Sequence, residues 1–392
     1  MSVERRASSV EQGGGPALPA LPALEIARAA YRDIALYAPD RAPCAVDLSD
    51  NTNLWGVPPA AERALREAAV STVTRYPSLY APAVKEALAG YLGVTPDMLV
   101  TGCGSDDVLD SAIRAFCEPG ERVAVPDPSF AMIPIFARMN GLEPVLVPLA
   151  GGTALDAGAM LASGARVIYL CSPNNPTGNP LDADAMRRVV REAPGVVIVD
   201  EAYAEFAERS ALDLLRESDR VLVCRTLSKA FGLAGLRVGY VVGAPALVAE
   251  VEKSRGPYKL NALAERAAVA ALTEDLPWVR AHVAEAVANR ERLADELRAR
   301  GLAPLPSQAN FVLVPVPDAA RLATRMRELG VAVRPFVGLP AIGDALRISV
   351  GPWAMLETCL RAYDEARKQE TGSRKQEAGS RNGPRDAPSR VR

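Results

Sequence analysis

The sequence predicts an α/β protein in which a mostly parallel mixed sheet is sandwiched by helices and a smaller α+β C-terminal domain follows. Short runs of apolar, β-branched residues alternate with helical patterns between residues 122 and 243. The runs are apolar throughout, which is typical of strands covered on both faces, and helices between consecutive strands favour parallel pairing. After about residue 259, two long helical stretches precede further strand-like runs and indicate a second unit.

The elements are predicted in chain order from their apolar patterns. Strands of the first unit are expected over residues 122–126, 144–149, 166–172, 196–200, 221–228 and 238–243. Apolar positions at helical spacing predict covering helices over residues 105–117 and 182–193. The second unit is expected to contain a long amphipathic helix over 277–300 and strands over 310–316, 331–336 and 345–351.

Composition sets the expected domain boundaries. A proline-spaced, low-complexity stretch, GGGPALPALPAL, predicts a disordered N-terminal tail over residues 1–22. The last 26 residues contain eight Lys and Arg against three Asp and Glu, which predicts a disordered basic tail over 367–392. Between the tails we expect an N-terminal arm over 23–50, a large ligand-binding domain over 51–258 and a small domain over 259–366.

Bulk composition excludes several classes of function. Apolar residues make up 49% of the 392 residues and the formal net charge is −2, so neither nucleic acid nor an anionic membrane is expected as a partner. No apolar run approaches the ~20 residues of a membrane span, and the N-terminus lacks a secretory signal. Six cysteines without a CxxC pair predict reduced thiols in a cytoplasmic protein. The single histidine, His282, falls in a helical pattern, so no His-based metal site or hydrolase triad is expected.

Polar side chains follow the predicted strands at the points where ligands bind in parallel sheets. They come from four segments: Asn174 and Asn175; Asp200 and Tyr203; Thr226, Ser228, Lys229 and Arg237; and Ser105 and Asp106 at the start of a helix. Asn–Pro turns, a carboxylate after a strand and Gly-rich turns are each common in proteins. The four segments therefore point to a site only in combination.

Lys229 has small or apolar neighbours from Leu227 to Ala234, apart from Ser228. Burying an ammonium group without a partner costs several kcal/mol. Either the side chain reaches out to water or its amine serves as a neutral nucleophile. Lowering a lysine pKa from near 10.4 to about 7 takes roughly 4 to 5 kcal/mol of bias against the charged form, which burial can supply.

Four motifs occur in the order SPNNPTG, VDEAY, SKAFGLAGLRVGY and LRISVG. The set resembles the class I/II aminotransferases of pyridoxal phosphate fold type I, and most closely the histidinol-phosphate aminotransferases, from about Tyr37 to about residue 365. The resemblance implies pyridoxal 5'-phosphate as the cofactor, a small-molecule amino donor and a 2-oxo acid as substrates, and a homodimer with shared active sites. The reaction implied is amino transfer between L-histidinol phosphate and 2-oxoglutarate in histidine biosynthesis. Two alternatives stay open: an aminotransferase for aromatic or other amino acids, and a lyase similar to threonine-phosphate decarboxylase.

The resemblance also implies a role for each matching residue. Lys229 would bind the cofactor aldehyde covalently and later move a proton from the substrate α-carbon. Asp200 would face the pyridine nitrogen and keep the ring protonated, and Tyr203 and Asn175 would hydrogen-bond the phenolate oxygen. The cofactor phosphate would be held by Ser105, Asp106, Thr226, Ser228 and Arg237, with Phe130 stacked on the ring. Substrate would be bound by Tyr37, Asn51, Tyr76, Asn175, Arg334 and Arg347, of which the two tyrosines match residues that the family places in the partner subunit's site.

One segment departs from the family pattern. LSDNTNLWGVPP keeps Asn51 and Asn53 in register, but Thr52 stands where a glutamate is usual. Leu54 and Trp55 replace a Pro-Leu pair. The segment borders the substrate pocket in relatives, so Trp55 either packs in the core or reshapes the pocket for a different donor.

Overall fold

The computed structural model describes residues 28–32, 34 and 42–381. The chain divides into two compact units, residues 1–39 and 40–392. The first is described only around helix α2 (Ala29–Arg32). The predicted N-terminal tail and Tyr37 lie outside the described residues, so the predictions made for them stay predictions.

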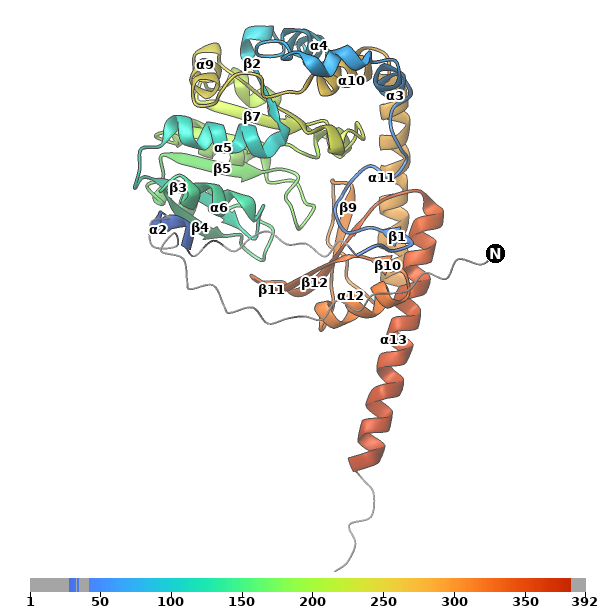
Figure 1. The fold of residues 1–392 in the computed structure, drawn as a ribbon. Helices are drawn as coiled ribbons and strands as arrows, with labels where there is room; N and C mark the ends of the chain where they lie inside the picture. Colours follow the sequence, from blue (N-terminus) through green and yellow to red (C-terminus); the bar gives the residue numbers. More distant parts are fainter. Residues whose placement is uncertain (1–27, 33, 35–41, 382–392) are drawn as a thin grey trace, which may run out of the picture. The chain divides into compact units, whose positions relative to one another are not determined.

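The second unit is built on a seven-stranded sheet in the order β2-β8-β7-β6-β5-β3-β4 (Figure 1). The strands are β2 Leu99–Cys103, β3 Arg122–Asp127, β4 Glu143–Pro148, β5 Val167–Cys171, β6 Val196–Asp200, β7 Val221–Thr226 and β8 Val238–Gly243. Strands β3 to β7 are parallel, and β8 is antiparallel to both of its neighbours. The predicted mostly parallel mixed sheet is confirmed. Strand β2 was not predicted, because its five residues end in Gly-Cys and run directly into a helix, a pattern typical of a turn.

Alternate residues of each strand face two separate apolar clusters. In β6, Ile198 packs in the cluster under α5 (Gly104–Phe116), α6 (Met132–Met139) and α9 (Pro245–Lys253). Its neighbours Val197 and Val199 pack in the cluster under α7 (Ala157–Ala162), α8 (Ala183–Glu192) and the 3-10 helix η4 (Ala211–Arg216). The strands are therefore covered on both faces, which explains why they are apolar throughout. Asp200 follows Ile198 at a spacing of two, so its side chain points toward the α5 face.

A second, three-stranded antiparallel sheet has the order β11-β12-β9. Its strands are β9 Phe311–Pro315, β11 Arg334–Leu339 and β12 Gly343–Ser349. The strand predicted over 331–336 is divided, because β10 (Val331–Ala332) pairs instead with β1 (Val46–Asp47). Helix α10 (Ala262–Thr273) packs on α3 (Pro59–Arg66) and α4 (Pro82–Leu92), so the division between the two predicted domains at residue 258 stays a prediction.

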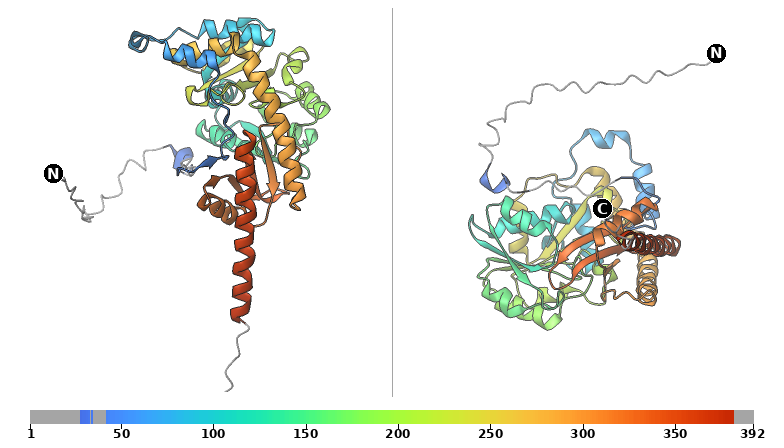
Figure 2. Two further views of the ribbon diagram at one scale, coloured as in Figure 1. Left: turned by 90° about the vertical axis from the view of Figure 1, so that its right-hand side faces the viewer. Right: turned by 90° about the horizontal axis from the view of Figure 1, so that it is seen from below.

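The long helices lie beside the second sheet. Helix α11 (Leu276–Ala299) contacts β9 and α13 (Trp353–Arg381), α12 (Ala319–Glu328) packs on β11, and α11 and α13 run side by side (Figure 2). Residues 367–381 continue α13, and the disordered basic tail over 367–392 stays a prediction. Lys, Arg, Gln, Glu and Ala are strong helix formers, and extending an existing helix avoids the cost of nucleation. Residues 382–392 lie outside the described part of the chain. None of the helices in the described residues combines the length and apolar character of a membrane span.

Candidate active site

The polar segments predicted from the sequence meet at one edge of the central sheet. Strands β5, β6 and β7 end in register, with Cys171 opposite Asp200 and Asp200 opposite Cys224. Because the strands are parallel, the turns that follow them lie at the same carboxyl edge. This edge brings together the SPNNPTG turn, the VDEAY segment and the turn that contains Lys229.

Asp200 is a buried carboxylate with a fixed orientation. Asp200 is only 3% exposed. Its carboxylate accepts hydrogen bonds from Tyr169 Oη at 2.8 Å and from the Ala202 N–H at 3.1 Å. Burial raises the pKa of Asp200 to about 6, while these two hydrogen bonds and the charge of Lys229 lower it. The carboxyl group is thus poised to share a proton with a basic ligand nitrogen near neutral pH.

Lys229 lies in the tight turn after β7. Its Nζ donates to the Asp50 carbonyl oxygen at 3.4 Å and lies 5.8 Å from the centre of the Tyr203 ring. Burial and, to a smaller extent, the positive charge of Arg347 lower the pKa of Lys229 to about 8. The amine is therefore neutral in a substantial fraction of molecules at mildly alkaline pH, as a nucleophile requires.

A candidate anion-binding cradle lies at the start of α5. Gly239 of β8 lets the helix end approach, since a Cβ there would lie 2.2 Å from the Ser105 nitrogen. Arg237, with a left-handed backbone, holds its guanidinium against Gly104 and pairs with Asp106 at 3.2 Å. Backbone N–H groups, the helix dipole and a guanidinium thus converge on one place, which suits a phosphate group.

Two hydroxyl groups stand at the turn that follows β7. Thr226 Oγ1 accepts a hydrogen bond from the Ser228 N–H at 3.1 Å and lies 2.9 Å from Ser228 Oγ. Both residues are buried. These bonds stiffen the turn and fix the backbone from which Lys229 projects.

Arg347 and Arg334 occupy one face of the second sheet. Arg347 on β12 is directly opposite Arg334 on β11, and directly opposed residues of an antiparallel pair share a face. Arg347 donates to Asn175 Oδ1 at 2.6 Å and to the Ser49 carbonyl at 2.9 Å, so the two sheets meet here. The pair therefore places two guanidinium groups on one face, and their binding of an anionic substrate stays a prediction.

Asn51 connects this face to Tyr203. Its backbone is left-handed, with φ of 58°, and its Nδ2 donates to Tyr203 Oη at 3.1 Å. Its backbone N–H and its Oδ1 both bond the hydroxyl of Ser349, which is 298 residues away in sequence. Tyr203 is buried and packs edge-on against Phe311. Asn51 therefore brings the segment LSDNTNLWGVPP, which departs from the family pattern, into the candidate site.

Trp55 packs on the apolar core beside the candidate site, where it lines a small cavity with Asn53, Ala230 and Asn310. Its ring contacts the apolar core and lies 6.0 Å from His282, itself a helical residue whose Nδ1 lies 2.8 Å from the Trp278 carbonyl. Of the two possibilities raised for Trp55, the structure supports packing in the core.

The roles predicted for two further residues, Tyr76 and Phe130, stay predictions. Tyr76 is 84% exposed and stacks on Tyr258 at 5.0 Å. Phe130 packs beside the apolar cluster under α5 and α6, and its contact with a ligand ring stays a prediction. The sequence analysis missed Tyr169, although a single tyrosine in the apolar strand VIYLC needs a buried hydrogen-bond partner, which was a signal that could have revealed it.

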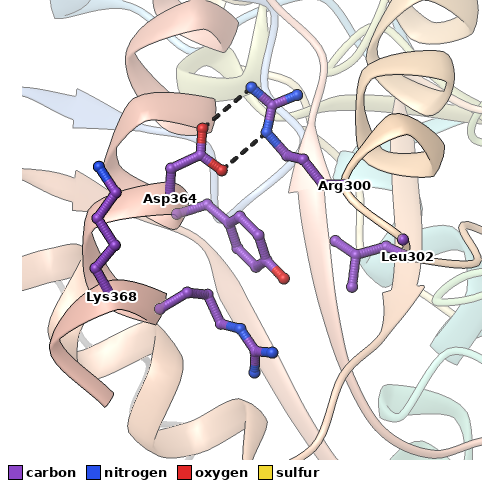
Figure 3. Close-up of a pocket in the computed structure, with 7 residues that line it drawn as sticks. Arg300, Leu302, Asp364 and Lys368 are labelled. Carbon is purple, nitrogen blue, oxygen red and sulfur yellow. Dashed lines mark hydrogen bonds and ion pairs between the residues drawn. The ribbon is translucent and has the colours of Figure 1, made fainter. Parts of the chain in front are cut away.

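A surface pocket of about 500 Å³ lies elsewhere, where α11 ends beside α13 (Figure 3). It is lined by Arg300, Leu302, Tyr363, Asp364 and Lys368, among others, and Arg300 is bound to Asp364 at 2.9 and 3.2 Å. None of the site residues in the described part of the chain lines it. The chemistry therefore points to the sheet edge and not to this surface pocket.

The fold and these side chains indicate an α/β enzyme with a candidate site beside the buried Lys229. The chain belongs to the class I and II aminotransferases, since the model of that family matches residues 44–362. It is 40% identical to a histidinol-phosphate aminotransferase of Methylibium petroleiphilum over 88% of this chain and 95% of the relative. It is 36% identical to an aromatic amino acid aminotransferase of Corynebacterium efficiens over 86% of this chain and 98% of the relative.

A solved structure gives the same result for the fold. The histidinol-phosphate aminotransferase of Sinorhizobium meliloti, in complex with pyridoxal-5'-phosphate, superimposes with a TM-score of 0.78 at 26% identity. The match covers 90% of this chain and 99% of that chain. The fold expected from the sequence is confirmed.

Proposed function

We propose that this protein is a pyridoxal phosphate-dependent aminotransferase that moves an amino group between L-histidinol phosphate and 2-oxoglutarate. The observation that carries the proposal is the meeting of Lys229, Asp200 and the α5 anion cradle at one sheet edge. The 40% identity to a histidinol-phosphate aminotransferase over 88% of the chain supports the choice of donor.

The residues at the sheet edge fit the cofactor group by group. Bound pyridoxal phosphate supplies an aldehyde conjugated to an electron-accepting ring. Lys229 would hold the cofactor through that aldehyde, and the buried Asp200 carboxylate would keep a proton on the ring nitrogen. The N–H groups of Ser105 and Asp106, with Arg237, bind the phosphate. The Lys229 amine would also serve as the base that moves a proton at the substrate α-carbon.

The remaining residues orient the ring and the substrate. Tyr203 and Asn175 bind the phenolate oxygen, and the paired donors Asn51 Nδ2 and Arg347 Nη1 fix the positions of those two side chains. Arg347 binds a carboxylate of the 2-oxo acid and Arg334 supplies a second positive charge on the same face. Two guanidinium groups suit substrates that carry a phosphate or a second carboxylate.

Replacing Arg347 with alanine is expected to weaken productive binding of 2-oxoglutarate. Loss of a buried charged partner costs about 2–5 kcal/mol, which corresponds to roughly 30- to 4000-fold in kcat/KM. Steady-state kinetics for the 2-oxo acid measure this loss, and Arg321→Ala, at an exposed position of α12, serves as the matched control. Equal kcat/KM for the wild type and the Arg347→Ala variant would rule out this role.

Replacing Gly239 with alanine is expected to weaken cofactor binding by about 10-fold or more, because the new methyl group would push the α5 N-terminus away from the cradle. Titration of the apoprotein with pyridoxal phosphate, followed by absorbance, measures the change. Gly90→Ala in α4 is the control, since a Cβ there meets nothing within 4 Å. An unchanged dissociation constant for the Gly239→Ala variant would show that the cradle does not hold the phosphate.

A homodimer with shared sites is part of the proposal. An apolar surface supports it, formed by Val70, Val73, Tyr76, Leu79, Tyr80 and Tyr258, of which Val70 and Tyr76 are each 84% exposed. Tyr76 on this surface would reach the site of the second copy. A cytoplasmic location is also proposed, since all six cysteines are free thiols.

The donor is tested by the half-reaction. Histidinol phosphate, phenylalanine and tyrosine are added separately to the purified holoenzyme, and the loss of the cofactor absorbance band is timed before 2-oxoglutarate is supplied. The proposal predicts the largest rate per molar donor for histidinol phosphate. A larger rate for phenylalanine or tyrosine would favour the aromatic function, which the Corynebacterium efficiens relative supports. Carbon dioxide release from threonine phosphate without a 2-oxo acid would indicate the lyase.

A further inference from the structure

A buried ion pair lies directly behind the candidate site. Glu201 follows Asp200 in sequence and Arg225 precedes Thr226, and the two side chains are 2% and 7% exposed. Arg225 donates to Glu201 Oε2 from Nε at 3.0 Å and from Nη2 at 2.8 Å. The pair therefore joins the ends of β6 and β7, the two strands that carry Asp200 and Lys229.

The pair lies on the opposite face of the sheet from the Asp200 carboxylate. The Glu201 N–H donates to the Cys224 carbonyl at 2.8 Å, so the ladder between β6 and β7 continues one residue past Asp200. Side chains alternate along a strand, which places Glu201 toward η4 and Asp200 toward α5. Glu201 accordingly bonds Ser210 and Ala211, at the start of η4.

The hydrogen-bonding capacity of the Glu201 carboxylate is filled. Its two oxygens accept from Nε and Nη2 of Arg225, from Ser210 Oγ at 3.1 Å and from the Ala211 N–H. Arg225 Nη2 also donates to Ser210 Oγ at 2.6 Å. A carboxylate held by four donors, away from the ligand face, is not available to move a proton. Its effect on the reaction can only be exerted through the backbone that it fixes.

We infer that Glu201 and Arg225 are positioning residues that set the separation between the Asp200 carboxylate and the Lys229 amine. The inference rests on the proposed function, because the separation matters only if one ring bridges the two groups. From Arg225 the chain reaches Lys229 through the stiff turn built on Thr226 and Ser228. A shift of β7 relative to β6 would therefore move Lys229 relative to Asp200.

The test uses the holoenzyme and two single variants, Glu201→Gln and Arg225→Lys. Glu201→Gln keeps the shape of the side chain. Arg225→Lys keeps the positive charge but loses the two guanidinium N–H donors that bond Glu201 in a fixed geometry. We expect kcat for the amino donor to fall about 10- to 100-fold, because small misplacements of reacting groups are costly. KM should change by less than about 3-fold. The pKa read from the pH titration of the bound-cofactor absorbance should shift by about half a unit or more.

The matched control is Asp364→Asn, which removes the partner of Arg300 from an arginine–carboxylate pair remote from the site. It should leave kcat and the absorbance pKa unchanged. The inference would be overturned if both site variants had lower thermal stability but wild-type kcat and absorbance pKa. A rise in KM alone would also overturn it. If Glu201→Gln yields no folded protein, Arg225→Lys decides. A wild-type protein without cofactor absorbance or transamination would instead overturn the proposed function.

Discussion

The Lys229→Ala variant is expected to lose transamination by about 10³-fold or more while it keeps its fold. The alanine can neither bind the cofactor aldehyde nor carry the proton from the α-carbon. Removing a lysine whose pKa burial lowers to about 8 also removes a desolvation cost, so the fold should not suffer. Half-reaction kinetics with histidinol phosphate measure the loss, and circular dichroism verifies the fold.

The control for this experiment is Lys253→Ala, since the Lys253 side chain is 70% exposed and pairs with Glu250 of its own helix. It should retain full activity. A small primary amine added to the Lys229→Ala variant should restore part of the proton transfer, which separates loss of the amine from general damage. Turnover of the Lys229→Ala variant at the wild-type rate would show that another residue performs the chemistry.

Asp200→Asn is expected to lower kcat by about 10²-fold or more and to stabilise the apoprotein. An amide cannot hold a proton on the ring nitrogen as a carboxylate does. Burial raises the pKa of Asp200 from 3.8 to about 6, so the folded apoprotein loses stability as the pH rises from about 4 to 6. The loss amounts to roughly 3 kcal/mol above pH 6, and asparagine avoids it.

Thermal unfolding of the wild-type and Asp200→Asn apoproteins at several pH values tests the direction of this change in stability. The melting temperature of Asp200→Asn should exceed that of the wild type at pH 7.5, and the difference should shrink toward pH 4. Asp184→Asn in α8, where the side chain is 92% exposed, should behave as the wild type. A wild-type apoprotein that is more stable than Asp200→Asn at pH 7.5 would mean that the ionised Asp200 carboxylate stabilises the folded protein.

The residues that could be predicted from the sequence lie in linear motifs. Asp200 and Lys229 each follow an apolar strand, and parallel strands bring their carboxyl ends to one edge whatever the details of packing. Arg334 and Arg347 lie in strand-like runs close together in sequence, so their position on one face of a sheet could have been predicted. The central sheet was predictable for the same reason, apart from β2.

The contacts made by residues distant in sequence could not be predicted. Asn51 hydrogen-bonds Ser349 and Asn310, each more than 250 residues away in sequence. Its backbone is left-handed although the residue is not a glycine, so the residue type does not reveal this conformation. The Asp50 carbonyl that receives Lys229 is a backbone group, on which the residue type gives no information. The continuation of α13 beyond Arg367 was not predicted, because charge and low hydrophobicity outweighed helix propensity in the prediction.

The most direct test is to locate the covalent bond between protein and cofactor. Purified protein, saturated with pyridoxal phosphate, is treated with borohydride to make the linkage permanent, digested and examined by peptide mass spectrometry. We predict one added pyridoxyl phosphate per chain, on the peptide that contains Lys229, and none in the Lys229→Ala variant. Modification at another lysine, or no modification in the saturated protein, would contradict the assignment of this sheet edge as the active site.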